Sequence, residues 1–198
     1  MTNKRASTNV NLEPPGAGLP GPELIAARLL FAIQRTLRSR AGWTDMFLRE
    51  YNTMLQQYEL VGPGEAATAI LIKRLPGLED SSRNWSICMV LEHLAIVNDG
   101  VRNIITALTN NEIPPGKVST ADVKPSKRDS HKSVSKFIES ADALSKCIEC
   151  SADLKTRLRY DHPWFGSLSA AGWHAMSAFH MQLHRKQVDR ILSGLRDR

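Results

Sequence analysis

The sequence predicts an all-α protein in which four long helices form one bundle. Apolar residues recur every three to four positions in four long segments, the spacing of a helix that buries one face. No stretch alternates between apolar and polar residues for long enough to predict a strand. The chain has 198 residues, 42% hydrophobic and 23% charged, which suits a single globular domain. Such helices on one chain favour an antiparallel bundle, whose ligand and metal sites form between facing helices.

The chain begins with a segment that we expect to be a disordered tail, residues 1–21, and a helical domain is expected over residues 22–198. The tail is polar at first and then rich in proline and glycine, so it offers little apolar surface to bury. Pro22 suits the first turn of a helix, and the apolar pattern then continues to about residue 59. Gly42 lies inside this pattern and either bends the helix or divides it; the sequence leaves both open.

The middle of the chain is expected to contain a short helix, a long helix and a long loop. Gly-Pro-Gly at residues 62–64 interrupts the pattern, and a short extra helix is predicted over residues 65–74. A long helix is predicted from about residue 85 to residue 108, with residues 81–84 as its capping candidates. Residues 110–128 show no periodicity, which predicts a long loop of the kind that is often functional or mobile.

Two further helices complete the predicted bundle. Asp129 or Ser130 can cap the first of them, whose apolar pattern continues to Leu154. A compact apolar connection follows over residues 162–168. Ser169 is the expected N-cap of the final helix, which is expected to end near residues 193–194 (Ser-Gly).

Composition and charge disfavour several classes of protein. No run of about 18 apolar residues is free of charge, so no membrane span is expected. No apolar segment follows the N-terminus as it would in a secretory signal, and three cysteines suit a reducing cytoplasm better than a disulfide framework. The net charge of +6 is spread along the chain without a DNA-binding motif. We therefore expect a cytoplasmic protein with a basic surface and no nucleic-acid partner.

Two histidines of the final helix form the first candidate site. His180 and His184 are four residues apart, so both imidazoles leave the same helix face about one turn apart. This face is the apolar stripe, where an unpaired polar group costs roughly 2–7 kcal/mol. A divalent metal bound by the neutral rings is one explanation. Hydrogen bonds to backbone carbonyls or water in an ordinary core are the other, and the pair alone does not decide between them.

A third histidine favours the metal. His93 lies in the middle of the apolar stripe of the helix over residues 85–108. If the two helices pack, three imidazoles converge on a metal from one side and leave coordination positions open for water or substrate. That is the layout of a catalytic site rather than of a closed structural one. We therefore predict that His93, His180 and His184 bind a divalent metal.

The remaining histidines are weaker candidates. His174 is six residues before His180, so it is expected on a different side of the helix, at the surface or behind the ligands. His162 precedes a proline in the apolar connection and is expected to pack that connection. His131 opens a helix beside a lysine and is expected to be solvated.

Other reactive or aromatic residues have structural interpretations. Cys147 and Cys150 form a C-x-x-C pair, but inside a helical pattern rather than at a helix N-terminus, which disfavours a redox or metal role. Glu92 points about 100° away from the histidine that follows it, so it is a weak candidate for a general base. Trp85 and Trp173 are expected to pack the bundle, and either can also wall a pocket.

Two motifs resemble those of a known family. The helical Trp-Ser-x-x-x-x-Leu-Glu-His-Leu over residues 85–94 and the His-x-x-x-His of the final helix resemble motifs of the DinB-like (YfiT-type) metalloenzymes. The connection over residues 162–166, His-Pro-Trp-Phe-Gly, looks like a variant found in that group. The resemblance implies a four-helix bundle in up-down-down-up order with one long crossover. It also implies a divalent metal, Zn or Ni most often, at the positions that match His93, His180 and His184.

The resemblance also implies an activity. Characterised relatives include S-transferases that use bacillithiol or mycothiol, and a thiol-dependent isomerase. We therefore expect a metal-dependent S-transferase or hydrolase that acts on a small molecule, with a low-molecular-weight thiol as candidate partner and metal-bound water or thiolate as the reacting group. The alternative is a non-enzymatic stress or interaction protein whose histidines are structural or whose metal is incidental. The reaction, substrate and oligomeric state stay open, a homodimer included.

Overall fold

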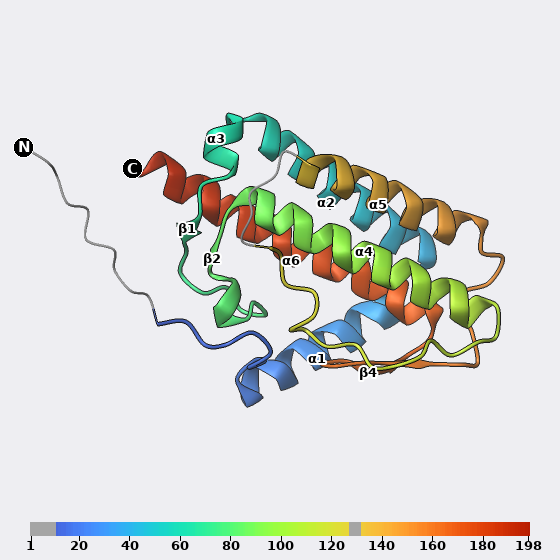
Figure 1. Ribbon diagram of the computed structural model, residues 1–198. Helices are drawn as coiled ribbons and strands as arrows, with labels where there is room; N and C mark the ends of the chain where they lie inside the picture. The colour runs from blue at the N-terminus through green and yellow to red at the C-terminus, as the bar shows by residue number, and fades with distance from the viewer. Residues whose placement is uncertain (1–10, 127–131) are drawn as a thin grey trace, which may run out of the picture.

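The computed structural model describes residues 11–126 and 132–198, and within them the predicted four-helix bundle is confirmed. Its helices are α2 (Arg40–Glu59), α4 (Ile87–Thr109), α5 (Lys132–Cys150) and α6 (Ala170–Arg196). In Figure 1, α4 and α5 run in one direction and α2 and α6 in the other, so the order is up-down-down-up. The described part of the crossover after α4, residues 110–126, returns along the bundle toward the end where α5 begins. Helix α4 packs on both α5 and α6, and α2 packs on α6.

The segment before the bundle is a separate helix, α1 (Gly21–Leu37), which packs on α6 and crosses below the bundle in Figure 1. The helix predicted up to residue 59 is therefore divided, but not at Gly42. The break lies at Arg38, whose backbone is extended, and Ser39. The Ser39 hydroxyl caps α2 by accepting the N–H of Gly42 at 3.1 Å, so Gly42 completes a cap rather than forming a hinge.

The predicted short extra helix is present, but its predicted extent over residues 65–74 is wrong. Helix α3 (Pro63–Ala66) has only four residues, and the chain then becomes extended. Strand β1 (Ile70–Leu71) pairs antiparallel with β2 (Asn84–Trp85). Tertiary packing explains the difference, because Ile70 is buried against α6 at Gly194, where a Cβ would come within 2.5 Å of Ile70 Cγ2. The expectation of no strands is corrected accordingly.

The start of α4 also differs from the expected capping site. Residues Asp80–Ser82 form a 3-10 turn, η1, instead of serving as caps. The cap is Ser86, whose Oγ accepts the N–H of Met89 at 3.2 Å. Along the chain, η1 and β2 thus come between β1 and α4.

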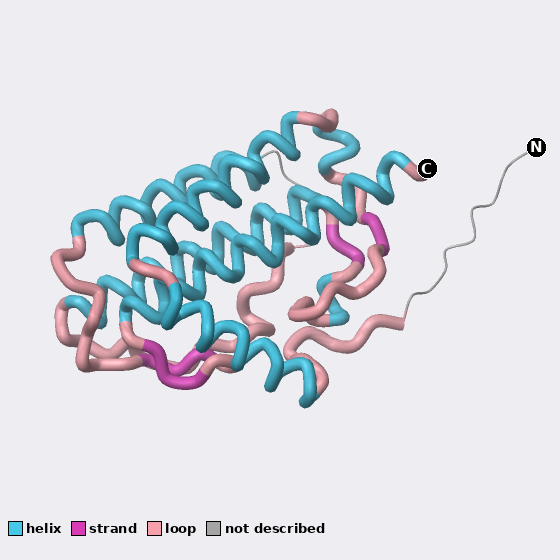
Figure 2. Tube along the Cα trace, turned by 180° about the vertical axis from the view of Figure 1, so that it is seen from behind, coloured by secondary structure: helices cyan, strands magenta, loops and turns pink. Residues whose placement is uncertain are grey.

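A second strand pair precedes the last helix. Strands β3 (Tyr160–His162) and β4 (Gly166–Leu168) pair antiparallel, and Gly166 adopts a φ of 70° at the end of their turn. Figure 2 shows the two strand pairs well apart on the molecule. Ser169 is the N-cap of α6, as predicted, with its Oγ accepting the N–H of Gly172 at 3.3 Å. Helix α6 continues beyond the expected end to Arg196.

The other boundaries follow from the described residues. The expected caps of α5, Asp129 and Ser130, lie outside them, and α5 ends at Cys150, although Leu154 beyond it is buried. Within the expected tail, residues 11–20 are described and lie against η1: the N–H of Glu13 donates to Asp80 Oδ2 at 3.0 Å. None of the described helices combines the length and the apolar character needed to cross a membrane.

Candidate metal centre

The structure brings together the three histidines predicted to bind a metal. His93 reaches inward from α4, and His180 and His184 reach inward from consecutive turns of α6. The Nε2 atom of His180 lies 3.2 Å from Nε2 of His93 and 3.0 Å from Nε2 of His184. We call these residues the His triad. Their ligand nitrogens lie within 4.8 Å of one another, so the prediction that the imidazoles converge is confirmed.

Hydrogen bonds on the far side of two rings determine which nitrogen carries the proton. Nδ1 of His93 lies 2.6 Å from the carbonyl oxygen of Val123, and Nδ1 of His184 lies 2.7 Å from Oε1 of Gln187. The Gln187 amide is oriented by its own Nε2, which donates to the carbonyl of Ser82 at 2.8 Å. Both partners of the rings can only accept, so each Nδ1 is protonated and each Nε2 presents a lone pair to the triad.

This assignment leaves the triad short of protons. Nε2 of His93 and Nε2 of His184 are both acceptors, and His180 can donate one Nε2–H at most, so hydrogen bonds within the triad cannot satisfy both. One divalent metal would satisfy all three lone pairs. Two imidazole nitrogens at 2.0–2.1 Å from a tetrahedral metal are about 3.3–3.4 Å apart, close to the separations observed here. The residues present therefore fit a metal.

The electrostatic environment keeps the ligands neutral. Burial lowers the pKa of His93 to about 4. Burial also lowers the pKa values of His180 and His184, and the neighbouring imidazoles lower them further. Within the described residues no carboxylate joins this group. An all-imidazole set of neutral rings suits Zn, Ni, Cu or Fe better than Mg or Ca.

An aromatic residue and an ion pair cover one side of the triad. Trp85 stacks nearly parallel to His184, with ring centroids 6.2 Å apart and 8° between the planes, and also contacts His93. Lys124 lies over the Trp85 ring and forms a salt bridge with the buried Glu79. Burial opposes ionisation of Glu79, but the hydrogen bond and charge of Lys124 outweigh it and lower the pKa of this carboxyl. Trp85 is buried and packs the bundle, as expected, and it contacts the triad without being one of the residues that line the adjoining cavity.

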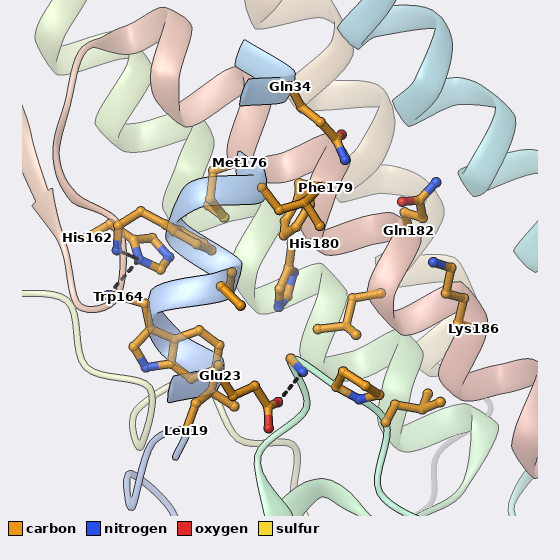
Figure 3. Close-up of a pocket in the computed structure, with 18 of the residues that line it drawn as sticks. Leu19, Glu23, Gln34, His162, Trp164, Met176, Phe179, His180, Gln182 and Lys186 are labelled. Atoms are coloured by element: carbon orange, nitrogen blue, oxygen red, sulfur yellow. Dashed lines mark hydrogen bonds between the residues drawn. The ribbon is translucent and has the colours of Figure 1, made fainter. Parts of the chain in front are cut away.

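The triad adjoins a cavity of about 460 Å³ that His180 helps to line. Figure 3 shows this cavity between α1, which contributes Gln34, and α6, which contributes Met176, Phe179 and His180. The turn that begins at His162 and residues 75–77 also contribute to its lining. The size lies within the usual range of small-molecule sites. The lining is mostly apolar, and His180 is the triad member exposed to it.

The other histidines differ in how well the sequence placed them. His174 points away from the triad, as expected, but it is buried rather than at the surface, and its Nε2 lies 3.2 Å from Oγ1 of Thr44. His162 packs its own turn, as expected: Nδ1 accepts the backbone N–H groups of Trp164 and Phe165. His131 lies outside the described residues.

The remaining candidates keep their structural interpretations. Cys147 and Cys150 are free thiols in the last turn of α5, away from a helix N-terminus. Glu92 accepts the hydroxyl of Ser126 at 2.9 Å and is not part of the triad. Trp173 is buried and donates its Nε1–H to the carbonyl of Tyr160 at 3.2 Å.

Comparison with known proteins supports the fold. No protein-family model matches the chain, and no curated protein sequence matches it. Among solved structures, the crystal structure of TT2238, described as a four-helix bundle protein, is similar with a TM-score of 0.57 and 16% identity. The alignment covers 76% of this chain and 98% of TT2238. Fold and site together define a four-helix-bundle protein with a buried His triad, and at this identity the likeness extends to the fold alone.

Proposed function

We propose that this protein is a divalent-metal-dependent enzyme of the DinB-like type, an S-transferase that uses a low-molecular-weight thiol or a hydrolase, acting on a small molecule. The observation that supports it is the arrangement of Nε2 lone pairs beside a cavity. His93 and His184 each present an unprotonated Nε2 to the triad. His180 can donate a hydrogen bond to only one of these two nitrogens, so the other stays unsatisfied. His180 connects this group to the cavity. Zn or Ni is the proposed metal.

The residues of the chain have separable tasks in this proposal. His93, His180 and His184 would hold the metal, which when bound lowers the pKa of a coordinated water or thiol. Val123 and Gln187 hold two of the rings in the required tautomer and orientation. The apolar cavity would hold the substrate next to His180 and exclude water from it.

A catalytic role is favoured over a structural one by the number of ligands. Three imidazoles leave at least one position of a tetrahedral metal open, whereas structural zinc sites have four protein ligands. The bundle also has an extensive core of its own: the side chains of Phe47, Met54, Leu91, Ile105 and Leu144 are almost completely enclosed. Such a core folds through apolar burial and does not need a metal.

Paired alanine substitutions on α6 test the metal site. Protein without a polyhistidine tag is purified, and its bound Zn and Ni are measured by mass spectrometry. We expect about one equivalent in the wild type, a loss in His180→Ala, and retention in His174→Ala, because His174 contacts Thr44 rather than the triad. Equal metal content in the two variants, whether retained or lost, contradicts the assignment.

A second experiment tests the activity. Metal-loaded and chelator-treated protein are screened for transfer of a low-molecular-weight thiol and for ester hydrolysis. Activity that disappears with the metal supports the enzyme. A metal-loaded protein that is folded and inactive in both assays supports the alternative, a non-enzymatic bundle with an incidental metal.

A further inference from the structure

The amide of Gln34 is an uncommitted polar group in the wall of the cavity. Gln34 lies on α1 and lines the cavity opposite α6 (Figure 3). Its Oε1 is enclosed, and among the described residues this oxygen has no hydrogen-bond partner. Gln182 also lines the cavity, but its Nε2 donates to Glu50 Oε1 at 3.4 Å. Of these two chemically identical side chains, Gln34 is therefore the one with an enclosed and unpaired acceptor, whereas the amide of Gln182 is held toward Glu50 through its Nε2.

The surroundings of Gln34 are aromatic. Phe165 and Phe179 both line the cavity, and their ring centroids are 6.1 Å apart in an edge-to-face arrangement. Phe31 lies behind them, 4.5 Å from Phe165 and 5.5 Å from Phe179 between ring centroids. Rings in this arrangement offer both faces and edges to a further ring. A flat apolar molecule suits this wall.

The charged group that α1 contributes to the cavity wall, Glu23, is already neutralised. Glu23 accepts the Nη1–H of Arg74 at 2.9 Å and the backbone N–H of Gly77 at 2.5 Å. The Arg74 side chain lowers the pKa of Glu23, so the carboxylate stays ionised and paired. Glu23 is therefore not free to pair with a cationic ligand, and the other charged side chain of the lining, Lys186, belongs to α6. The α1 side of the wall, where Gln34 lies, therefore favours a neutral group of the ligand.

We propose that this cavity binds a neutral aromatic molecule with one hydroxyl or N–H group, which donates to Oε1 of Gln34. The amide can rotate to direct Oε1 into the cavity without breaking a hydrogen bond of that oxygen, because the oxygen makes none among the described residues. A bound donor satisfies an acceptor that is otherwise buried and unpaired, which is unfavourable. That this molecule is the substrate rests on the proposed function; its binding in the cavity needs no metal.

Two probes of almost equal shape test the hydrogen bond. They are 2-naphthol and 2-methylnaphthalene, which differ by a hydroxyl in place of a methyl group. Water solvates the hydroxyl better, so an apolar cavity without a polar partner binds 2-methylnaphthalene more tightly. We expect the wild type to prefer 2-naphthol about tenfold, a factor that corresponds to about 1.4 kcal/mol. Affinities are measured by calorimetry on metal-free and zinc-loaded protein.

Substitutions assign the preference to Gln34. Gln34→Leu should reverse the preference, whereas Gln34→Glu keeps an acceptor and should retain it. Gln182→Leu is the matched control and should also retain it, because the amide of Gln182 is directed toward Glu50. Circular dichroism checks that each variant is folded.

The outcomes separate this proposal from the proposed function. A wild type that prefers 2-methylnaphthalene, that binds neither probe, or whose preference survives in Gln34→Leu overturns the ligand class, whatever the metal content. A hydroxyl preference that depends on Gln34 in a protein that binds no metal supports the ligand class and counts against the metalloenzyme.

Discussion

Replacement of Gln187 by leucine tests whether the hydrogen bonds behind the His triad control the site. The Gln187 side chain is 0% exposed, accepts from Nδ1 of His184 at 2.7 Å and donates to the carbonyl of Ser82 at 2.8 Å. Gln187→Leu leaves both partners buried and unpaired, at about 1–3 kcal/mol each. We expect the free energy of unfolding to fall by about 2–6 kcal/mol. The zinc affinity should fall about 10–100-fold, because the His184 ring loses the acceptor that orients it.

Zinc affinity is measured by competition with a chromophoric chelator, and stability by denaturant unfolding of the metal-free protein. Gln57→Leu is the control: Gln57 is 9% exposed on α2 and donates to Asp189, away from the triad. It should lose stability and keep its zinc affinity. Gln187→Glu retains an acceptor for His184 and should keep most of the affinity, although its carboxylate faces the Ser82 carbonyl. Unchanged zinc binding in Gln187→Leu would refute the orienting role.

Three further predictions follow from other parts of the structure. Chelation of the metal should leave the helical circular dichroism signal nearly unchanged and lower the melting temperature only by binding linkage; unfolding on chelation would make the metal structural. Burial opposes ionisation of Glu50, but the hydrogen bond and charge of Arg185 outweigh burial and hold the pKa of Glu50 below the ordinary 4.5. The stability that this carboxylate contributes is therefore present above pH 4.5 and is lost as the pH falls through the lowered pKa. The difference in unfolding free energy between wild type and Glu50→Gln should therefore narrow below pH 4.5, and a constant difference would contradict the assignment. Removal of residues 1–10 should leave the melting temperature unchanged, whereas removal of residues 1–19 should lower it. The reason is that the N–H groups of Glu13 and Gly16 donate to Asp80 of η1 and to Glu79 just before it; equal melting temperatures would show that these bonds are dispensable.

The sequence was sufficient for the long helices but not for the chain around them. Apolar spacing predicts a helix that packs one face, and α4 and α5 follow this rule. Helix α6 buries more than one face, because it packs on α1, α2 and α4, and residues 172–178 are all buried. His174 was expected at the surface or behind the ligands, and it is enclosed and lies beside Thr44. The predicted extent of the short helix over residues 65–74 was wrong for a related reason: Ile70 fits helical spacing, but it packs on Gly194 and lies in a strand.

The same reasoning explains why the ligands of the triad could be predicted and their acceptors could not. A ligand must lie on the inner face of a helix, so its spacing reveals it. Gln187 lies three residues after His184, one turn along α6, and only that spacing marks it. Val123 contributes a backbone carbonyl from an aperiodic loop, and a carbonyl has no side-chain signature.

These two acceptors belong to one connected structure. Lys124, the neighbour of Val123, donates to Oγ of Ser82 at 3.1 Å and pairs with Glu79, and the Ser82 carbonyl in turn accepts from Gln187. The crossover loop and η1 are thus joined by the same side chain that lies over Trp85. A shift of η1 would move the acceptors of both His93 and His184, although these ligands belong to different helices. The connection between the two acceptors helps α4 and α6 to hold the three imidazoles in a fixed geometry. The relative orientation of the rings depends on this connection as well as on the packing of the two helices.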